Sequence, residues 1–241
     1  MERIISILAG AIAVIFIFAP HEFAHAFVAY KCGDPTAKMR GRMSLNPLKH
    51  LDPVGYALCV VAGFGWAKPV PINPYNFKKY RSGLFFTAIA GVVTNYIIAF
   101  IAYPLSLLVK LLYIQNEAFF LAHIGLNVLV QILRRALLYI FIYGLNVIVF
   151  NLLPLFPLDG FRVVEAFTRE INPVRRFLRN YGQMILMLLV IESFLCGILI
   201  DYVPSIAGIV GYFDILGYVQ YFGTKILGFP ITALWNLIIP V

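Results

Sequence analysis

The sequence predicts an all-α integral membrane protein, a polytopic helical bundle with a small β or loop element after its first helix. Of its 241 residues, 61% are hydrophobic and 12% are charged, whereas soluble domains contain about 25% charged residues. Because backbone polar groups at membrane depth must be paired within the chain, the spans are expected to be helices. Residues 1–241 are expected to form one membrane-embedded domain in the lipid bilayer, with a core over about residues 1–200.

Four apolar segments are long enough to cross a bilayer, which takes about 20 helical residues. The apolar stretch 54–65 is too short to cross. The stretch 118–133 is apolar but contains amides, and it is expected to form a separate helix at the membrane interface. The predicted spans cover residues 4–30, 83–112, 136–157 and 181–200.

The last forty residues leave their topology open. After Asp201 and Pro204 come two apolar stretches, 205–222 and 226–240. They are compatible with a hairpin, with two short spans or with two surface helices. Residues 201–241 are therefore treated as a C-terminal apolar extension of the core.

Basic residues predict how the helices are oriented. Residues 31–82 contain nine Lys or Arg against two Asp, and residues 160–181 contain five Arg against two Glu. With four spans, both segments lie on one side of the membrane, which the positive-inside rule makes cytoplasmic. The net charge of +8 is accounted for by such loops, so nucleic acid is not an expected partner. We expect a multi-pass protein of the cell membrane.

The first span contains two histidines and a glutamate within residues 21–25. Ionisable side chains at membrane depth are costly and usually have a function. His21 and His25 are four residues apart, so on a helix they project from one face, as two ligands of a zinc ion must. Glu22 lies beside them, where a general base can act on a metal-bound water. At 1.5 Å per residue, His25 lies about 9 Å from Lys31 and the cytoplasmic surface.

A catalytic zinc site usually has three protein ligands, and Asp159 is the foremost candidate for the third. Pro154 and Pro157 interrupt the helix just before it, and irregular backbone at membrane depth is tolerated where it is buried or lines a cavity. The alternative is that Asp159 caps a helix beginning at Phe161, and position alone does not decide. The other candidates are His50, His123, Glu165, Asp201 and Glu192, of which Glu192 is expected to have a polar neighbour as its partner.

Three motifs follow one another in the order HExxH at residues 21–25, GxxxN at 91–95 and LDG at 158–160. Together they resemble the site-2 protease family of intramembrane zinc metalloproteases, in its compact bacterial and archaeal form. The resemblance covers about residues 1–200. Many relatives carry Pro where this chain has Val92, a difference expected to alter local backbone without abolishing the chemistry.

The resemblance implies roles for six residues. His21, His25 and Asp159 would hold Zn²⁺. Glu22 would take a proton from the metal-bound water and hand one to the leaving amine. Asn95 and Asn151 would contact the substrate backbone, and Asn95 is placed to stabilise an oxyanion. For both asparagines, interhelical hydrogen bonding is the alternative.

The implied activity is that of an endopeptidase acting within or near transmembrane segments of membrane protein substrates, in regulated intramembrane proteolysis. Control by a regulatory membrane partner is expected. A helical substrate must unwind before cleavage, and it could then pair with an exposed strand edge in residues 36–72, with Met39–Leu45 as the candidate strand. The alternatives are a metal-binding membrane transporter, which would not need Glu22 between the ligands, and a non-catalytic membrane scaffold.

Overall fold

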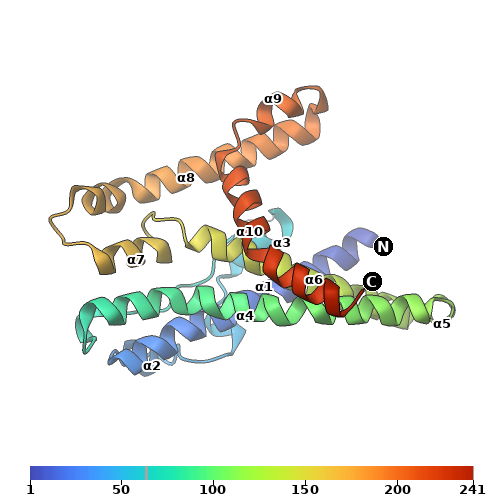
Figure 1. Cartoon of the computed structure of the whole chain (residues 1–241), viewed down its shortest axis with the longest axis horizontal. Coiled ribbons are helices and arrows are strands. Elements are labelled where there is room, and N and C mark those ends of the chain that lie inside the picture. Colours follow the sequence, from blue (N-terminus) through green and yellow to red (C-terminus); the bar gives the residue numbers. More distant parts are fainter. Residues whose placement is uncertain (63–64, 241) are drawn as a thin grey trace.

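Four long helices dominate the computed structural model, which describes residues 1–62 and 65–240 (Figure 1). Within these residues they are the helices long and apolar enough to cross a membrane, which confirms a polytopic helical membrane protein. Each of the four predicted spans falls on one of them. They are α1 (Glu2–Cys32), α4 (Tyr80–Gln115), α6 (Ile124–Asn151) and α8 (Pro173–Tyr202).

Shorter elements connect the long helices. Four of them, α2, η1, α3 and η2, lie between α1 and α4, and α7 lies between α6 and α8. The shorter elements are α2 (Thr36–Met39), η1 (Pro47–Lys49), α3 (Pro53–Ala62), η2 (Pro74–Asn76), α5 (Glu117–Ala122), α7 (Asp159–Phe167), η3 (Pro204–Ile206), α9 (Ala207–Gly211) and α10 (Ile215–Ile238).

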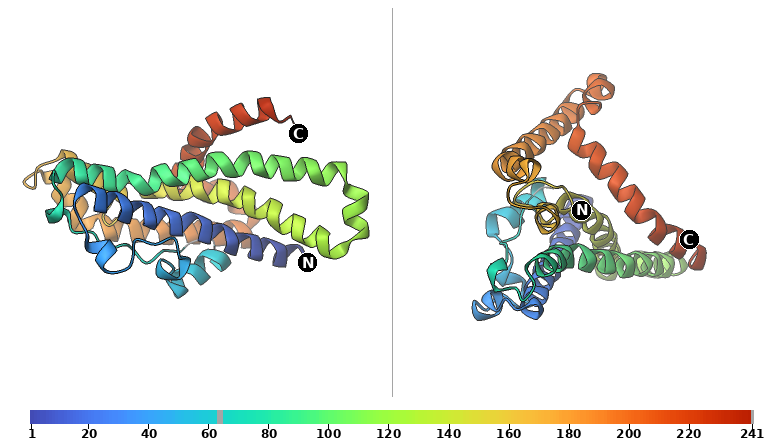
Figure 2. Two further views of the ribbon diagram at one scale, coloured as in Figure 1. Left: turned by 90° about the horizontal axis from the view of Figure 1, so that it is seen from below. Right: turned by 60° about the vertical axis from the view of Figure 1, so that its left-hand side comes forward.

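The core is a bundle of α1, α4 and α6, which run side by side (Figure 2). Ala13 on α1 and Ala102 on α4 are buried where the helices meet, and Ile17 and Ile140 pack against them. Because lipid tails are as apolar as the side chains, helices in membranes associate by close packing, which small residues permit. The alanine-rich faces therefore allow α1 and α4 to approach closely enough for their side chains to share one site.

The helix α8 packs much less extensively than the three core helices. In the most apolar 18-residue stretch of α8, 6% is buried, against 44% in the corresponding stretch of α1. At its N-terminal end a buried ion pair joins it to α7, where Arg175 Nη2 lies 2.5 Å from Glu165 Oε1. Most of the apolar surface of α8 is thus left for lipid.

The C-terminal extension contains one long helix. Residues Ile215–Ile238 form α10 without a break, with Pro230 inside it. This helix crosses the core and buries Ile231 against Phe141 and Leu145 of α6. The stretches 205–222 and 226–240 are therefore not two arms of a hairpin.

The third span differs from its prediction at both ends. The helix α6 begins at Ile124 and ends at Asn151, so residues 118–133 do not form a separate interface helix. The expected break at Pro154 and Pro157 is present, because no regular helix covers residues 152–158. Since proline lacks the backbone N–H that continues a helix, the chain turns here and begins α7 at Asp159.

The prediction of a strand at Met39–Leu45 is wrong. Met39 ends α2, and Gly41 adopts a left-handed conformation with φ +65°. The N–H of Gly41 donates to Lys38 O and that of Arg42 donates to Ala37 O, which is the Schellman pattern that ends a helix. Among the described residues, the strand-like pairing is limited to an isolated bridge between residues 51 and 67.

A buried carboxylate holds the connection between α1 and α4 in place. The Asp34 carboxylate accepts hydrogen bonds from Thr36, from Asn73 N at 2.7 Å and from Asn76 Nδ2 at 2.8 Å. Burial raises the pKa of Asp34, but the hydrogen bonds to its ionised form outweigh that effect and hold the pKa below its ordinary value of 3.8. Asp34 therefore fixes residues 73–76 against the end of α1.

We expect Asp34→Asn to lower stability by about 1–3 kcal/mol, because buried donors lose their acceptor. A carboxyl group whose pKa is lower in the folded state than in the unfolded state stabilises the fold at pH values above its ordinary pKa. This contribution is lost as the pH falls through the folded-state pKa. The difference in the free energy of unfolding between wild type and D34N should thus be constant from pH 7 to about pH 5 and should shrink below about pH 4. Thermal unfolding in detergent across this range measures it, and a difference that grows on acidification would contradict the assignment.

Candidate active site

The two histidines of the first span and the aspartate of α7 converge at the centre of the molecule. The Nε2 atoms of His21 and His25 are 3.0 Å apart. Asp159 Oδ2 lies 3.4 Å from the first and 3.1 Å from the second. Both histidines are buried, at 3% and 5% exposure. Three donor atoms that sequence separates by up to 138 positions therefore form one small triangle.

This triangle has the dimensions of one face of a zinc coordination tetrahedron. With metal–ligand bonds of 2.0–2.1 Å, neighbouring ligand atoms are about 3.3 Å apart. Asp159 Oδ2 is buried and accepts no hydrogen bond from the described residues. A buried acceptor without a partner is costly, and a cation between the three atoms would satisfy it. The donor set of two imidazoles and one carboxylate suits Zn²⁺.

Asp159 does not cap the helix that it begins. The N-cap of α7 is Leu158, and no side chain caps this helix end. Among the described residues, His21, His25 and Asp159 are the group of His, Cys, Asp and Glu close enough to share a metal ion. The other candidates lie elsewhere: His50 contacts Ser44 O at 2.6 Å, and Glu192 accepts a hydrogen bond from Cys196 Sγ at 3.5 Å.

The glycine of the LDG motif explains how Asp159 reaches the histidines. A Cβ atom at Gly160 would collide with the carbonyl oxygens of Leu152 and Leu153. Glycine therefore lets the start of α7 fold back onto the end of α6. That turn directs the preceding residue, Asp159, toward α1.

The helix α4 supports both histidines from behind. His25 Nδ1 lies 2.6 Å from the backbone oxygen of Thr87, and Asn95 Nδ2 lies 3.1 Å from His21 Nδ1. Between them, a Cβ atom at Gly91 would lie 2.5 Å from His21 Cε1 and 2.5 Å from His25 Nε2. The GxxxN motif thus makes room for two imidazole rings and places an amide one turn further along.

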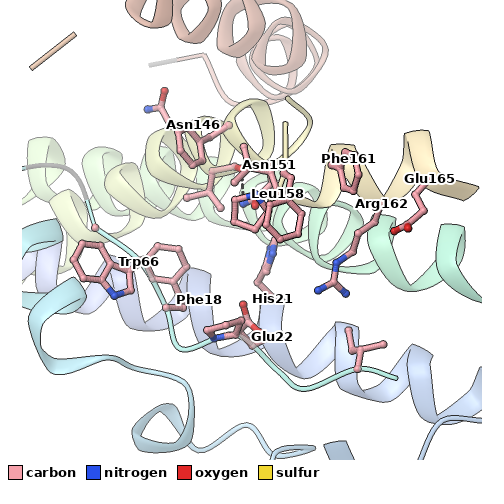
Figure 3. Close-up of a pocket in the computed structure, with 18 of the residues that line it drawn as sticks. Phe18, His21, Glu22, Trp66, Asn146, Asn151, Leu158, Phe161, Arg162 and Glu165 are labelled. Atoms are coloured by element: carbon pink, nitrogen blue, oxygen red, sulfur yellow. Dashed lines mark hydrogen bonds between the residues drawn. The ribbon is translucent and has the colours of Figure 1, made fainter. Parts of the chain in front are cut away.

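Glu22 lies beside the histidines and has a backbone partner. Its Oε2 accepts a hydrogen bond of 2.8 Å from the N–H of Val70, within the irregular segment 65–73 that passes next to α1 (Figure 3). One carboxylate oxygen is therefore fixed while the other stays available. No side-chain pattern could mark Val70 as the partner of Glu22, because its contribution is a backbone N–H.

A cavity of about 850 Å³ opens onto His21 and Glu22. Its walls come mainly from α1, α6, α7 and the segment 65–74, as the close-up shows for most of them (Figure 3). The helices α3, α4, α8 and α10 contribute one lining residue each. Asn151 is part of this wall, whereas Asn95 is not and is only 1% exposed. Side chains in the wall that were not predicted as site residues are Trp66, Asn146, Arg162 and Gln220. Arg162 had a signal in its spacing, since it lies one helical turn after Asp159.

Comparison with known proteins finds relatives of this chain. The family model described as "Peptidase family M50" matches residues 9–193. "Putative zinc metalloprotease YwhC" of Bacillus subtilis is 47% identical over 154 residues, 64% of this chain and 66% of the relative. "Putative zinc metalloprotease Rip2" of Mycolicibacterium smegmatis is 27% identical over 180 residues, 71% of this chain and 62% of the relative.

The corresponding Rip2 of Mycobacterium tuberculosis H37Rv is 26% identical over 155 residues, 62% of this chain and 53% of the relative. The chain thus spans between about half and two thirds of the length of these relatives. No solved structure matches.

We expect Gly91→Ala to weaken zinc binding at least tenfold, because the added methyl group occupies space needed by both imidazoles. Metal analysis of purified protein and competition with a chelator measure the effect. Gly10→Ala on α1 is the matched control, since a Cβ atom there meets nothing within 4 Å. Unchanged zinc affinity in G91A would show that the two helices separate easily, contrary to the packing described.

Proposed function

Because the chain belongs to peptidase family M50, we propose that it is a zinc-dependent endopeptidase that hydrolyses peptide bonds within or near transmembrane segments of membrane proteins. One observation carries this proposal. His21, His25 and Asp159 present three donor atoms within 3.4 Å of one another, beside a cavity that His21 and Glu22 both line. The donors alone would fit a metal store or transporter, whereas a carboxylate beside them fits hydrolysis.

The metal would be held by His21 Nε2, His25 Nε2 and Asp159 Oδ2. When bound, Zn²⁺ supplies a Lewis acid and lowers the pKa of a water molecule. Three protein ligands leave a fourth position for water or substrate, as is usual in catalytic rather than structural zinc sites. The cavity beside His21 provides access to that position.

Glu22 is proposed as the general base and acid. The Val70 N–H fixes its Oε2, so Oε1 is the oxygen that accepts a proton from the attacking water. The same carboxyl group then protonates the leaving amide nitrogen, which separates the two products. Holding one oxygen removes rotational freedom from the carboxylate and keeps the other directed at the reacting atoms.

The substrate is proposed to bind as a locally unwound segment. Unwinding frees backbone N–H and C=O groups, which need partners at membrane depth. Asn151 Nδ2 donates to Val147 O at 3.0 Å on its own helix, which leaves Oδ1 as an acceptor in the cavity wall. Substrate binding by Asn151 would therefore consist of accepting a backbone N–H from the unwound segment.

The site is proposed to lie near the cytoplasmic face. The basic segments 31–82 and 160–181 flank the end of the bundle at which α1 ends and α4 begins, and the positive-inside rule places that end in the cytoplasm. His25 is closer to the C-terminal end of α1 than to its N-terminal end, so the path for water is shorter from the cytoplasmic side. Control by a regulatory membrane partner stays a prediction from the sequence.

The decisive variant is Glu22→Gln, which keeps the size and polarity of the side chain but removes the base. Cleavage of a model single-span substrate in liposomes should fall by about 10²–10⁴-fold, while bound zinc stays at about one per chain. Glu117→Gln, an exposed change on α5, is the matched control and should cleave normally. Zinc-loaded wild type that cleaves no more than E22Q would contradict the proposed activity.

The orientation has its own test, in a variant whose three native cysteines are replaced by alanine. Lys79→Cys lies at the start of α4 and Asn116→Cys just after its end, and both positions are exposed. A membrane-impermeant maleimide should label position 79 only in inverted vesicles and position 116 only in intact cells. The reverse pattern would place the site near the outer face.

A further inference from the structure

The outer nitrogens of both histidines face the same helix. On α4, Thr87, Gly91 and Asn95 are four residues apart, so they lie along one face. That face contacts His25 Nδ1 through Thr87 O at 2.6 Å and His21 Nδ1 through the Asn95 amide at 3.1 Å. Each imidazole is therefore held at Nδ1 by α4 and presents Nε2 to Asp159.

The partner of His25 fixes where its proton lies. A backbone carbonyl oxygen can only accept, so His25 Nδ1 carries the hydrogen and donates it to Thr87 O. In a neutral imidazole the other nitrogen then has a lone pair. His25 Nε2 is thus ready to bind a metal ion, and the same requirement applies to His21.

The amide of Asn95 can meet His21 in two ways, because its oxygen and nitrogen ends have nearly the same shape. With the NH₂ group toward Nδ1, His21 would accept there and carry its proton on Nε2, which faces His25 Nε2 at 3.0 Å and Asp159. No lone pair would remain for a metal. With Oδ1 toward Nδ1, His21 donates as His25 does, and Nε2 is free.

Burial supports the second arrangement. Asn95 is 1% exposed, and its Oδ1 lacks a hydrogen-bond donor among the described residues. Turning the amide gives that oxygen the Nδ1–H of His21 as a donor. Asn95 is also not part of the cavity wall, whereas Asn151 is part of it.

We propose that Asn95 is a positioning residue for the metal site, whose Oδ1 accepts the Nδ1–H of His21 and thereby holds Nε2 as a zinc ligand. This role rests on the proposed zinc chemistry and replaces a contact with the substrate. Partners of this kind fix the ring and raise ligand basicity, and their loss typically costs 10–100-fold in metal affinity. The GxxxN motif would then serve the metal ligands as a unit, through space at Gly91 and an acceptor at Asn95.

The test is zinc affinity, measured by chelator competition on the full-length chain in detergent. Asn95→Leu and Asn95→Ala remove the acceptor and should weaken binding 10–100-fold. Asn95→Asp keeps an acceptor-only group at the same place and should bind zinc within a few-fold of wild type. Asn151→Leu is the control for loss of an amide in the cavity wall, and it should keep wild-type affinity. Two apolar variants are measured because one of them can fail to fold.

The outcomes separate the two proposals. If N95L and N95A bind zinc as tightly as wild type but cleave poorly, Asn95 contacts the substrate and the inference is wrong. If N95D loses zinc as N95L does, the NH₂ group is the one that matters, and the inference is again wrong. Zinc-loaded wild type without cleavage would overturn the proposed function alone, whereas wild type that binds no zinc would overturn both.

Discussion

The approach of α1 to α4 at Gly91 is the contact on which the site depends. At this point a single hydrogen atom replaces a side chain, and two imidazole rings occupy the space. Their Nδ1 atoms meet the Thr87 carbonyl and the Asn95 amide. Because polar groups in a membrane find no water to replace a lost partner, each of these contacts must come from the protein itself. The alanine residues buried between α1 and α4 allow these helices to approach closely, since small residues let helix backbones pack directly.

Asp159 joins this pair of helices through a controlled interruption of α6. A continuous third helix would carry the aspartate past the histidines. Instead, Pro154 and Pro157 lie in the irregular stretch between α6 and α7, and Gly160 lets the chain fold back against Leu152 and Leu153. The irregular backbone lies beside the cavity, which is where a membrane tolerates it. Three parts of the bundle therefore contribute to the site in different ways. The spacing of residues on α1 places the histidines, α4 supports them, and the turn between α6 and α7 brings in Asp159.

Much of this arrangement was predictable from local rules. Hydropathy located the four long helices, and the four-residue spacing placed His21 and His25 on one face with Glu22 beside them. Position could not decide whether Asp159 binds metal or caps a helix, because that depends on a contact between segments 134 residues apart. The strand predicted at Met39–Leu45 failed because Gly41 and the hydrogen bonds around it close a helical turn. The course of α10 depends on packing against Phe141 and Leu145, which hydropathy does not encode.

The cavity wall combines residues inside and outside the stretch that the family model matches. The family model ends at residue 193, yet Gln220 of α10 faces the same cavity as His21 and Glu22. The proposed metal ligands and part of the enclosure beside them thus lie in separate stretches of sequence. Evolution can remodel that side of the chamber by changing the C-terminal helix, while the metal ligands and their supports remain untouched.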